Sequence, residues 1–148
     1  VYQLHREPST WGWVDDSNNV IHELLESEGE GKVVALKFEL SATITDDRIK
    51  TVLGNNCEIW SIRHSNPNND YIRSKNDLRD FRKIMRTAFD KIKAKHGQDA
   101  ELNIFPAMPV STAIELGRVW MPKADLPMII YDQNYKLGGF SKTITIKY

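Results

Sequence analysis

Short apolar runs alternate along this chain with segments of helical spacing, and this alternation limits the folds that the chain can adopt. The runs KVVALKFEL (32–40), CEIWSIR (57–63), ELNIF (101–105) and PMIIY (127–131) have the length and composition of strands. Between the second and third runs, apolar residues recur every three or four positions and line one helix face: Leu78, Phe81, Ile84, Met85, Ala88, Phe89 and Ile92. Strands alternating with helices predict an α/β fold with a mostly parallel sheet and helices on its faces.

Local signals predict where these helices begin and end. Ser74 and Asp77 form a capping pair in front of the long helix, and Gly97 stands where that helix should stop. Residues 46–54 have room for one or two helical turns. We therefore expect one long helix and one short one between the first three strands.

The last third of the chain predicts a further helix and a final strand. Residues 111–120 follow Pro109 and contain a capping-box pattern between Thr112 and Glu115. After two glycines, residues 140–148 alternate apolar and polar side chains, which is typical of a half-exposed strand. We expect this strand to lie antiparallel at an edge of the sheet.

Helical spacing also occurs near the start of the chain. Ser17 is a suitable cap and Gly29 a suitable stop for a helix that carries Val20, Ile21, Leu24 and Leu25 on one face. We therefore expect residues 1–31 to be an N-terminal segment with an acidic helix, either a linker or a remnant of a preceding half. Residues 32–148 would then form the α/β unit.

Composition excludes several classes of protein. The 148 residues contain 20 Lys and Arg, 20 Asp and Glu and one cysteine. A single cysteine rules out an internal disulfide and a Cys-rich zinc site, which suits a reducing cytosol. No apolar run approaches the ~18 to 20 residues of a membrane span, so we expect a cytoplasmic protein.

The net charge of zero conceals an uneven distribution along the chain. Residues 15–31 contain six acidic residues and no Lys or Arg, whereas residues 71–97 contain nine basic and three acidic residues. Separate blocks of opposite charge indicate surfaces that can meet a partner.

Signatures of catalysis and of metal binding are missing. The chain has no phosphate-binding Gly-rich loop, no GxGxxG after the first strand, no HExxH and no GxSxG. The four histidines lie far apart without ligand-like spacing, and Cys57 opens a strand, where a packed thiol is expected. We expect no metal, no cofactor and no catalytic residue.

The ends of the predicted strands supply candidates for a binding site, because ligands of parallel sheets bind beyond the carboxyl ends of the strands. Ser41 and Thr43 follow the first strand, and Arg63 and His64 end the second. A hydroxyl-rich turn or a solvated strand end explains these residues equally well. A phosphate contact by Arg63, or stacking of His64 on a base, is the functional alternative.

The segment FPAMPVST (105–112) follows the third strand. Its prolines stiffen the turn, its small residues let a ligand approach, and Ser111 and Thr112 lie where a helix begins. The free amides and the dipole of a helix N-terminus favour a phosphate there. Ser and Thr are also preferred helix caps, and the two roles are compatible.

Two further groups of residues admit both a structural and a functional interpretation. Trp11 and Trp13 either fasten a terminal segment to the core or offer stacking surfaces for bases. The polar face of the long helix is either simply solvated or a contact surface for an acidic partner, such as a second copy of the chain in a head-to-tail assembly. Its basic residues are Arg79, Arg82, Lys83 and Arg86.

Three motifs between residues 103 and 133 carry a family resemblance. They are Phe105-Pro-Ala-x-Pro, then Ser111-Thr-Ala-Ile-Glu-Leu-Gly-Arg118, then Met128-Ile-Ile-Tyr131-Asp132. Together they resemble the closing part of a SAVED domain, the sensor module of bacterial CBASS anti-phage systems. The strands KVVALKFELSAT and EIWSIRHS are compatible with the same module, so the resemblance covers roughly residues 30–148.

This resemblance implies a fold and a ligand. SAVED domains consist of two fused Rossmann-like halves, each similar to a CARF sensor. They bind a cyclic di- or trinucleotide, oligomerise and activate an effector: a DNA endonuclease, a TIR domain that destroys NAD, or a protease. With 148 residues, this chain has room for one half, the second, and carries no effector motif. The residues expected to contact the ligand are Ser41, Thr43, Arg63, His64, Pro106, Met108, Ser111, Thr112, Tyr131 and Asp132.

Three functions therefore stay open at this point. The first is a sensor that binds a cyclic oligonucleotide and triggers assembly of an antiviral effector. The second is a nucleotide hydrolase or ring nuclease, for which His64 and Asp132 are the only candidate acid or base. The third is a protein-docking domain that uses its charged faces alone.

Overall fold

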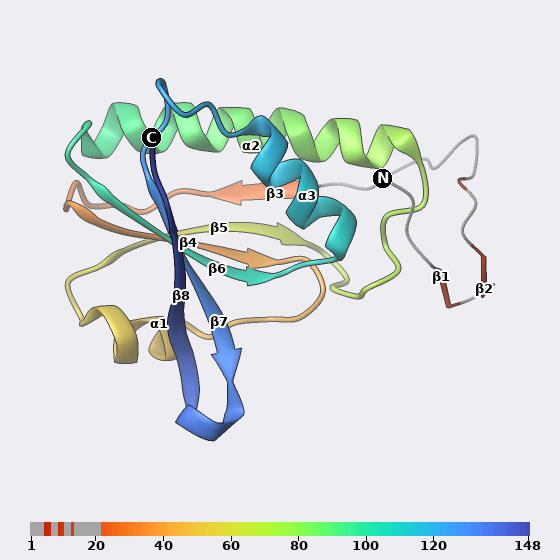
Figure 1. Ribbon diagram of the computed structural model, residues 1–148, viewed down its shortest axis with the longest axis horizontal. Coiled ribbons are helices and arrows are strands. Elements are labelled where there is room, and N and C mark those ends of the chain that lie inside the picture. The colour runs from red at the N-terminus through yellow and green to blue at the C-terminus, as the bar shows by residue number, and fades with distance from the viewer. Residues whose placement is uncertain (1–4, 7–8, 11–12, 14–21) are drawn as a thin grey trace.

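The computed structural model of the chain describes residues 5–6, 9–10, 13 and 22–148. Figure 1 shows a central sheet with helices on both of its faces. The elements are β1 (His5–Arg6), β2 (Ser9–Thr10), β3 (His22–Leu25), β4 (Val33–Glu39), α1 (Asp46–Leu53), β5 (Glu58–His64), α2 (Lys75–His96), β6 (Glu101–Ala107), α3 (Val110–Val119), β7 (Met128–Asn134), η1 (Tyr135–Leu137) and β8 (Gly139–Ile146).

The main sheet has six strands in the order β3-β5-β4-β6-β7-β8. Its four central strands are parallel, because β4 pairs in parallel with β5 and with β6, and β6 pairs in parallel with β7. Both edge strands, β3 and β8, are antiparallel to their neighbours. The structure thus confirms the α/β fold, the mostly parallel sheet and the antiparallel strand at the C-terminal end.

The larger core lies between the sheet and the helices α2 and α3. Strand β4 contributes Leu36 and Phe38, and α2 contributes Phe81 and Met85, all of them fully buried. The capping box predicted for α2 is present, since the Ser74 hydroxyl accepts from the Asp77 amide at 3.3 Å and the Asp77 carboxylate accepts from the Ser74 amide at 3.0 Å. Gly97 ends this helix at a φ of +89°, a conformation that favours glycine.

A smaller core lies on the opposite face, under α1 (Figure 1). It consists of Ala35, Ile44, Ile49, Phe105 and Tyr131, with half-buried apolar side chains around them. Helix α1 has 8 residues and α2 has 22. Among the described residues, α1 is the one helix on this face of the sheet, and Glu23 of β3 and Arg63 of β5 are exposed beside it.

The acidic helix predicted near the start of the chain is wrong within the described residues. Residues 22–25 form strand β3, which pairs antiparallel with β5. Their side chains alternate between half-buried and exposed, and Leu24 packs against the larger core. Pairing with the open edge of β5 outweighs the weak helical preference of this segment. The division of the chain after residue 31 stays a prediction, although β3 is hydrogen-bonded into the sheet of the later residues.

The capping box predicted for α3 is also wrong. The N-cap of α3 is Pro109, and no side chain caps this end of the helix. Glu115 instead forms ion pairs at 3.1 Å with Arg82 of α2 and with Arg118 of its own helix. Ion pairs with two guanidiniums stabilise the Glu115 carboxylate more than a hydrogen bond from one backbone amide would.

Candidate functional site

The sheet contains a switch point, where the connections leave in opposite directions. From β4 the chain passes through α1 to β5, and from β5 it crosses back through α2 to β6, on the other side of β4. The loops that follow β4 and β6 meet here, since the amides of Leu40 and Ser41 both donate to the Ala107 carbonyl at 2.9 Å. Ligands of open α/β sheets bind beside such a point.

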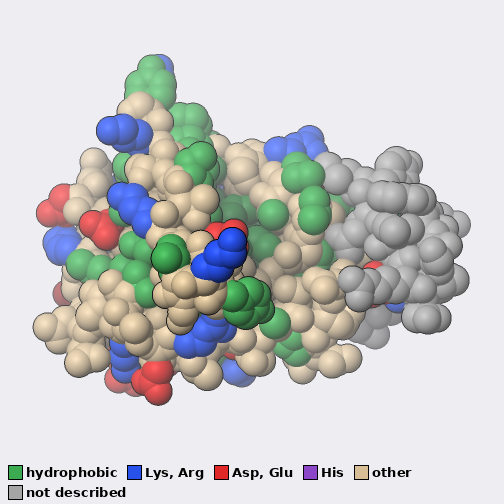
Figure 2. Space-filling model, turned by 60° about the horizontal axis from the view of Figure 1, so that its bottom comes forward, with side chains coloured by type: hydrophobic (Ala, Val, Ile, Leu, Met, Phe, Trp, Pro, Cys, Tyr) green, Lys and Arg blue, Asp and Glu red, His purple; other side chains and the backbone are tan. Residues whose placement is uncertain are grey.

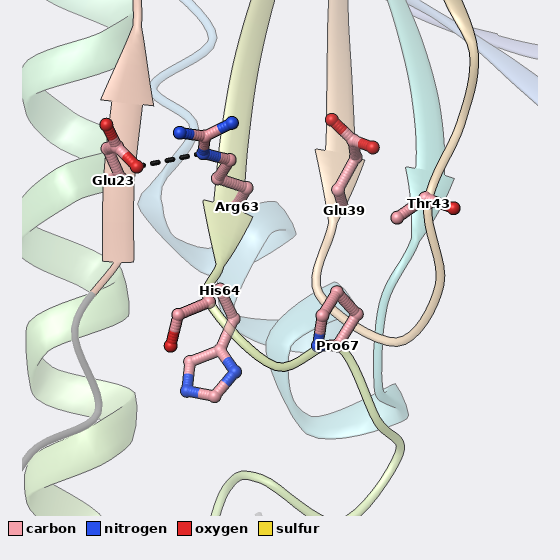
Figure 3. Close-up of a pocket in the computed structure, with 7 residues that line it drawn as sticks. Glu23, Glu39, Thr43, Arg63, His64 and Pro67 are labelled. Atoms are coloured by element: carbon pink, nitrogen blue, oxygen red, sulfur yellow. Dashed lines mark hydrogen bonds and ion pairs between the residues drawn. The ribbon is translucent and has the colours of Figure 1, made fainter.

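A hollow of about 390 Å³ lies next to the switch point, at the ends of β4 and β5 (Figure 3). We call it the strand-end pocket. Three of the predicted binding residues, Thr43, Arg63 and His64, line it together. Its other lining residues are Glu23, Glu39, Ser65 and Pro67. The carboxyl-end rule thus identified residues from two separate strands that share one cavity.

Arg63 presents a charged group at the rim of this pocket. Its Nε donates to Glu23 of β3 at 2.8 Å, and both side chains are about half exposed, at 46% and 52%. The hydrogen bond to Glu23 raises the pKa of Arg63 above its usual value. An ion pair this exposed contributes little to stability, so the guanidinium can exchange its carboxylate partner for an anionic ligand at small cost.

His64 also lines this pocket at the end of β5, and its ring extends beyond the strand end, away from the Arg63 side chain (Figure 3). Its ring stacks on Tyr71 with the centroids 4.6 Å apart and the planes inclined by 28°. The Tyr71 hydroxyl lies 2.9 Å from Nε2 of His22. Burial raises the pKa of Tyr71 and lowers the pKa of His22 to about 4. The ring of His64 is thereby held on a rigid aromatic support.

A charged clamp holds the loop after β4 in place. The Glu39 carboxylate accepts from the Ile44 amide at 3.0 Å and from the Ser61 hydroxyl at 3.2 Å. Lys37 donates to the Ile44 carbonyl at 2.8 Å and forms ion pairs with Glu39 and Asp46 at 3.0 Å each. Lys37 and Glu39 are both 13% exposed. This network fixes both backbone groups of Ile44 and with them the loop that carries Ser41 and Thr43.

The clamp makes a testable prediction for Glu39→Ala. Without its acceptor, we expect the Ile44 amide to exchange its hydrogen about tenfold faster, the effect of losing one charge-assisted hydrogen bond. Exchange followed residue by residue by NMR measures this. Asp46→Ala is the matched control, because Asp46 is 54% exposed and joins the clamp through its ion pair with Lys37. Equal exchange rates at Ile44 in the native chain and in Glu39→Ala would contradict the clamp.

The predicted residues at the start of α3 are inside the protein. Ser111 and Thr112 are completely buried, and the Thr112 hydroxyl donates to the Pro109 carbonyl at 2.7 Å. Their hydroxyls therefore do not face the strand-end pocket. Helix geometry still leaves the first amides of α3 without intrahelical acceptors, and a phosphate contact through these amides stays a prediction.

Four more predicted residues lie apart from the strand-end pocket. Pro106 and Met108 line a separate apolar hollow between α3 and the sheet. Tyr131 is 7% exposed and stacks on Phe105 at 4.7 Å, so it belongs to the smaller core. Asp132 is exposed on β7 and accepts from the Gln133 amide. Alternation along β6 and β7 separates these residues, since neighbouring side chains point to opposite faces.

The residues predicted for stacking and for assembly lie on the α2 side. Trp11 is outside the described residues, whereas Trp13 is half-buried and packs against the larger core. Arg82 pairs with Glu115, and Arg86 pairs with Asp90 at 2.8 Å and with Asp125, which raises the pKa of Arg86. The exposed basic residues Arg79 and Lys83 form no ion pair within residues 22–148.

The acidic and basic blocks of the sequence partly meet within one molecule. Glu26 pairs with Lys91 of α2, and Glu23 pairs with Arg63. Figure 2 shows side chains of both signs interspersed over one face of the described part. Charge that is separated along the chain is therefore partly neutralised in space.

A comparison with protein-family models matches residues 1–146 to SAVED, described as the "SMODS-associated and fused to various effectors sensor domain". The chain belongs to the SAVED family. No curated protein sequence matches this SAVED domain at a significant level. The family resemblance inferred from residues 103–133 is thereby confirmed, and the match extends to the start of the chain.

Two solved structures share the fold of this SAVED domain. Both are of the Acinetobacter baumannii Cap4 SAVED/CARF-domain containing receptor, one with the cyclic trinucleotide 2′3′3′-cAAA and one with 3′3′3′-cAAA. The first has a TM-score of 0.67 at 15% identity, and the second a TM-score of 0.62 at 10% identity. They cover 90% and 92% of this chain, which spans 28% and 29% of theirs.

Other kinds of site are not found in the described part of this SAVED domain. No group of three or more His, Cys, Asp or Glu side chains there is placed to hold a metal ion. Burial raises the pKa of the half-buried Cys57 thiol. Among the same residues, no helix is long and apolar enough to cross a bilayer.

Sequence reasoning missed the two carboxylates of the strand-end pocket. Glu39 stands two residues after Lys37 in a strand that is otherwise apolar, and a period of two places both on one face. That spacing was a usable signal for a polar patch at the strand end. Glu23 has no comparable signal, because the apolar residues around it have helical spacing.

Proposed function

We propose that this SAVED domain binds a cyclic oligonucleotide at the strand-end pocket and the adjoining switch point. The observation that carries the proposal is the convergence of Thr43, Arg63 and His64 in one hollow beside the loops that follow β4 and β6. The structurally similar Cap4 receptors, whose structures contain cyclic trinucleotides, support the same class of ligand.

The lining residues suit different parts of a nucleotide. Arg63 offers a guanidinium for a phosphate, and His64 on its Tyr71 support offers a surface for a base. Glu23 and Glu39 are acceptors, which match the donors of a nucleotide: ribose hydroxyls and amino groups of bases. The Thr43 hydroxyl can accept or donate. The phosphate next along the ring would meet the amides at the start of α3.

The arrangement favours binding over hydrolysis. The two candidate acid–base residues, His64 on β5 and Asp132 on β7, belong to strands separated by β4 and β6. Three strand spacings amount to roughly 14 Å, too far for the two side chains to act on one phosphodiester bond. A ligand bound intact then changes the protein only through its different affinity for two states. We propose that the favoured state is an assembled one that activates an antiviral effector.

Replacing Arg63 or His64 tests this assignment. We expect Arg63→Ala and His64→Ala each to weaken binding of a cyclic trinucleotide about tenfold, through loss of a charge-assisted hydrogen bond and of a stacking surface. Isothermal titration measures the dissociation constants. Lys142→Ala on β8 is a charge control that should leave the affinity unchanged. Equal affinities for all four proteins would contradict the assignment to this pocket.

A panel of cyclic di- and trinucleotides separates the three functions. The melting temperature of the chain and the integrity of each ligand, followed by chromatography, are recorded together. A sensor raises its melting temperature with the ligand intact, a hydrolase consumes the ligand, and a docking domain shows neither effect. Absence of a thermal shift with every member of the panel would refute the sensor.

A further inference from the structure

A second cleft lies between α2 and α3, and Trp13 forms part of its wall. It has a volume of about 360 Å³ and shares no residue with the strand-end pocket. We call it the α2–α3 cleft. Its lining residues are Trp13, Lys75, Leu78, Arg79, Arg82, Glu115 and Arg118. Four of these seven side chains are cations and one is a carboxylate, so the cleft is strongly positive.

The single carboxylate is at the base of the cleft and orients two of the cations. Glu115 is 1% exposed, and its two oxygens bind different guanidiniums: Oε2 accepts from Arg82 and Oε1 accepts from Arg118, each at 3.1 Å. Together these three side chains carry a net charge of +1. Arg82 and Arg118 are still 42% and 65% exposed, so both guanidiniums are held in place with donors to spare.

The other two cations lie where a positive charge destabilises the helix that carries them. Lys75 and Arg79 lie in the first two turns of α2, at the positive end of its dipole, where acidic residues stabilise a helix. They are four residues apart, and Lys83 follows four residues later, so like charges are neighbours on the helix surface. Neither Lys75 nor Arg79 pairs with a carboxylate of residues 22–148. An external anion would relieve this repulsion.

The shape and chemistry of the cleft select the kind of anion. A concave site of this volume fits a ligand of a few hundred Å³, whereas an acidic protein surface needs a broad, open face. Arginine forks suit phosphate oxygens, and an indole ring beside them suits a base. We propose that the α2–α3 cleft is a second binding site, for a nucleotide whose phosphate lies between Arg79, Arg82 and Arg118 and whose base lies against Trp13.

Two sources can supply this chemistry: a free nucleotide, or one residue of a single-stranded nucleic acid. The test titrates the chain with adenosine 5′-monophosphate, with inorganic phosphate and with a fluorescein-labelled 12-nucleotide deoxyadenosine strand. Binding is followed by titration calorimetry and by fluorescence anisotropy at several salt concentrations. Tighter binding of the strand with a steep salt dependence identifies the polynucleotide source, and preference for the monophosphate identifies the free nucleotide.

The variants assign the binding to the cleft. Lys75→Ala with Arg79→Ala should weaken binding of the preferred nucleotide probe at least tenfold, and a melting curve checks that the fold is kept. Trp13→Leu should weaken binding of the nucleotide probe at least fivefold and leave binding of inorganic phosphate unchanged. Lys142→Ala on β8, which lines neither pocket, is the matched charge control and should have no effect. Failure of both nucleotide probes to bind the native chain overturns the proposal. It is equally overturned if Lys75→Ala with Arg79→Ala abolishes only self-association in sedimentation, which would assign the cleft to an acidic surface of a second copy.

Discussion

Replacing Asp125 with alanine should lower the free energy of unfolding by about 3 kcal/mol, the effect of breaking a buried ion pair. The Asp125 side chain is 2% exposed and binds both Arg86 and the Met121 amide, the latter at 2.7 Å. Removing the carboxylate leaves a guanidinium and a backbone amide without their partner in a partly buried position. Urea unfolding, analysed with its slope, measures the loss.

A second carboxylate bound to Arg86 provides the matched control for this prediction. The same guanidinium also pairs with Asp90 at 2.8 Å, but Asp90 is 67% exposed. We expect Asp90→Ala to cost less than about 1 kcal/mol, as exposed pairs do. Replacing the buried pair together, Arg86→Met with Asp125→Leu, should recover most of the lost stability. Equal destabilisation by Asp125→Ala and Asp90→Ala would show that burial does not strengthen the ion pair between Arg86 and Asp125.

Acid should destabilise the protein through His22. Its pKa is lowered from 6.5 to about 4, mainly by burial and next by the charge of His64, while Asp80 and Asp77 act in the opposite direction. Between these pH values the unfolded chain binds a proton that the folded chain excludes, so stability falls as the pH decreases from 6.5 toward 4. The loss attributable to His22 amounts to about 3 kcal/mol over this window.

The comparison of His22→Gln with the native chain isolates this contribution from that of the carboxyl groups. The glutamine side chain in this variant stays uncharged, so the variant should lose about 3 kcal/mol less than the native chain when urea unfolding is repeated from pH 7 to pH 4. His64→Gln should keep most of the pH dependence, because burial of His22 is the larger cause. Parallel stability curves for the native chain and His22→Gln would show that His22 is protonated in the folded protein.

The strands and long helix of this SAVED domain could be predicted because each is specified by its own local pattern. The run that became β4 is apolar on both faces in its first half, and the apolar residues of the run that became α2 recur every three or four positions, as buried elements require. Strand β3 could not be recognised, because the adjacent Leu24 and Leu25 suit a helix and only pairing with β5 reveals alternation. An edge strand depends on a partner far away in sequence.

The candidate site could be predicted only in part. The end of a parallel strand locates Thr43, Arg63 and His64, and these three residues do share a pocket. The rule does not say which side chains near a strand end turn inward, and that depends on packing. Tyr131 is drawn into the smaller core by Phe105, and Ser111 and Thr112 are covered by their surroundings. Contacts between elements, such as the ion pair of Glu115 with Arg82 of α2, cannot be predicted from a local pattern.

Binding of a cyclic oligonucleotide at the strand-end pocket can be tested by hydrogen exchange with and without ligand. Amide exchange is measured residue by residue in the chain, alone and with a saturating cyclic trinucleotide. We expect slower exchange in residues 41–45 and 63–66, the loops that border the pocket. Unchanged exchange in both loops, or protection confined to α2 and α3, would contradict it.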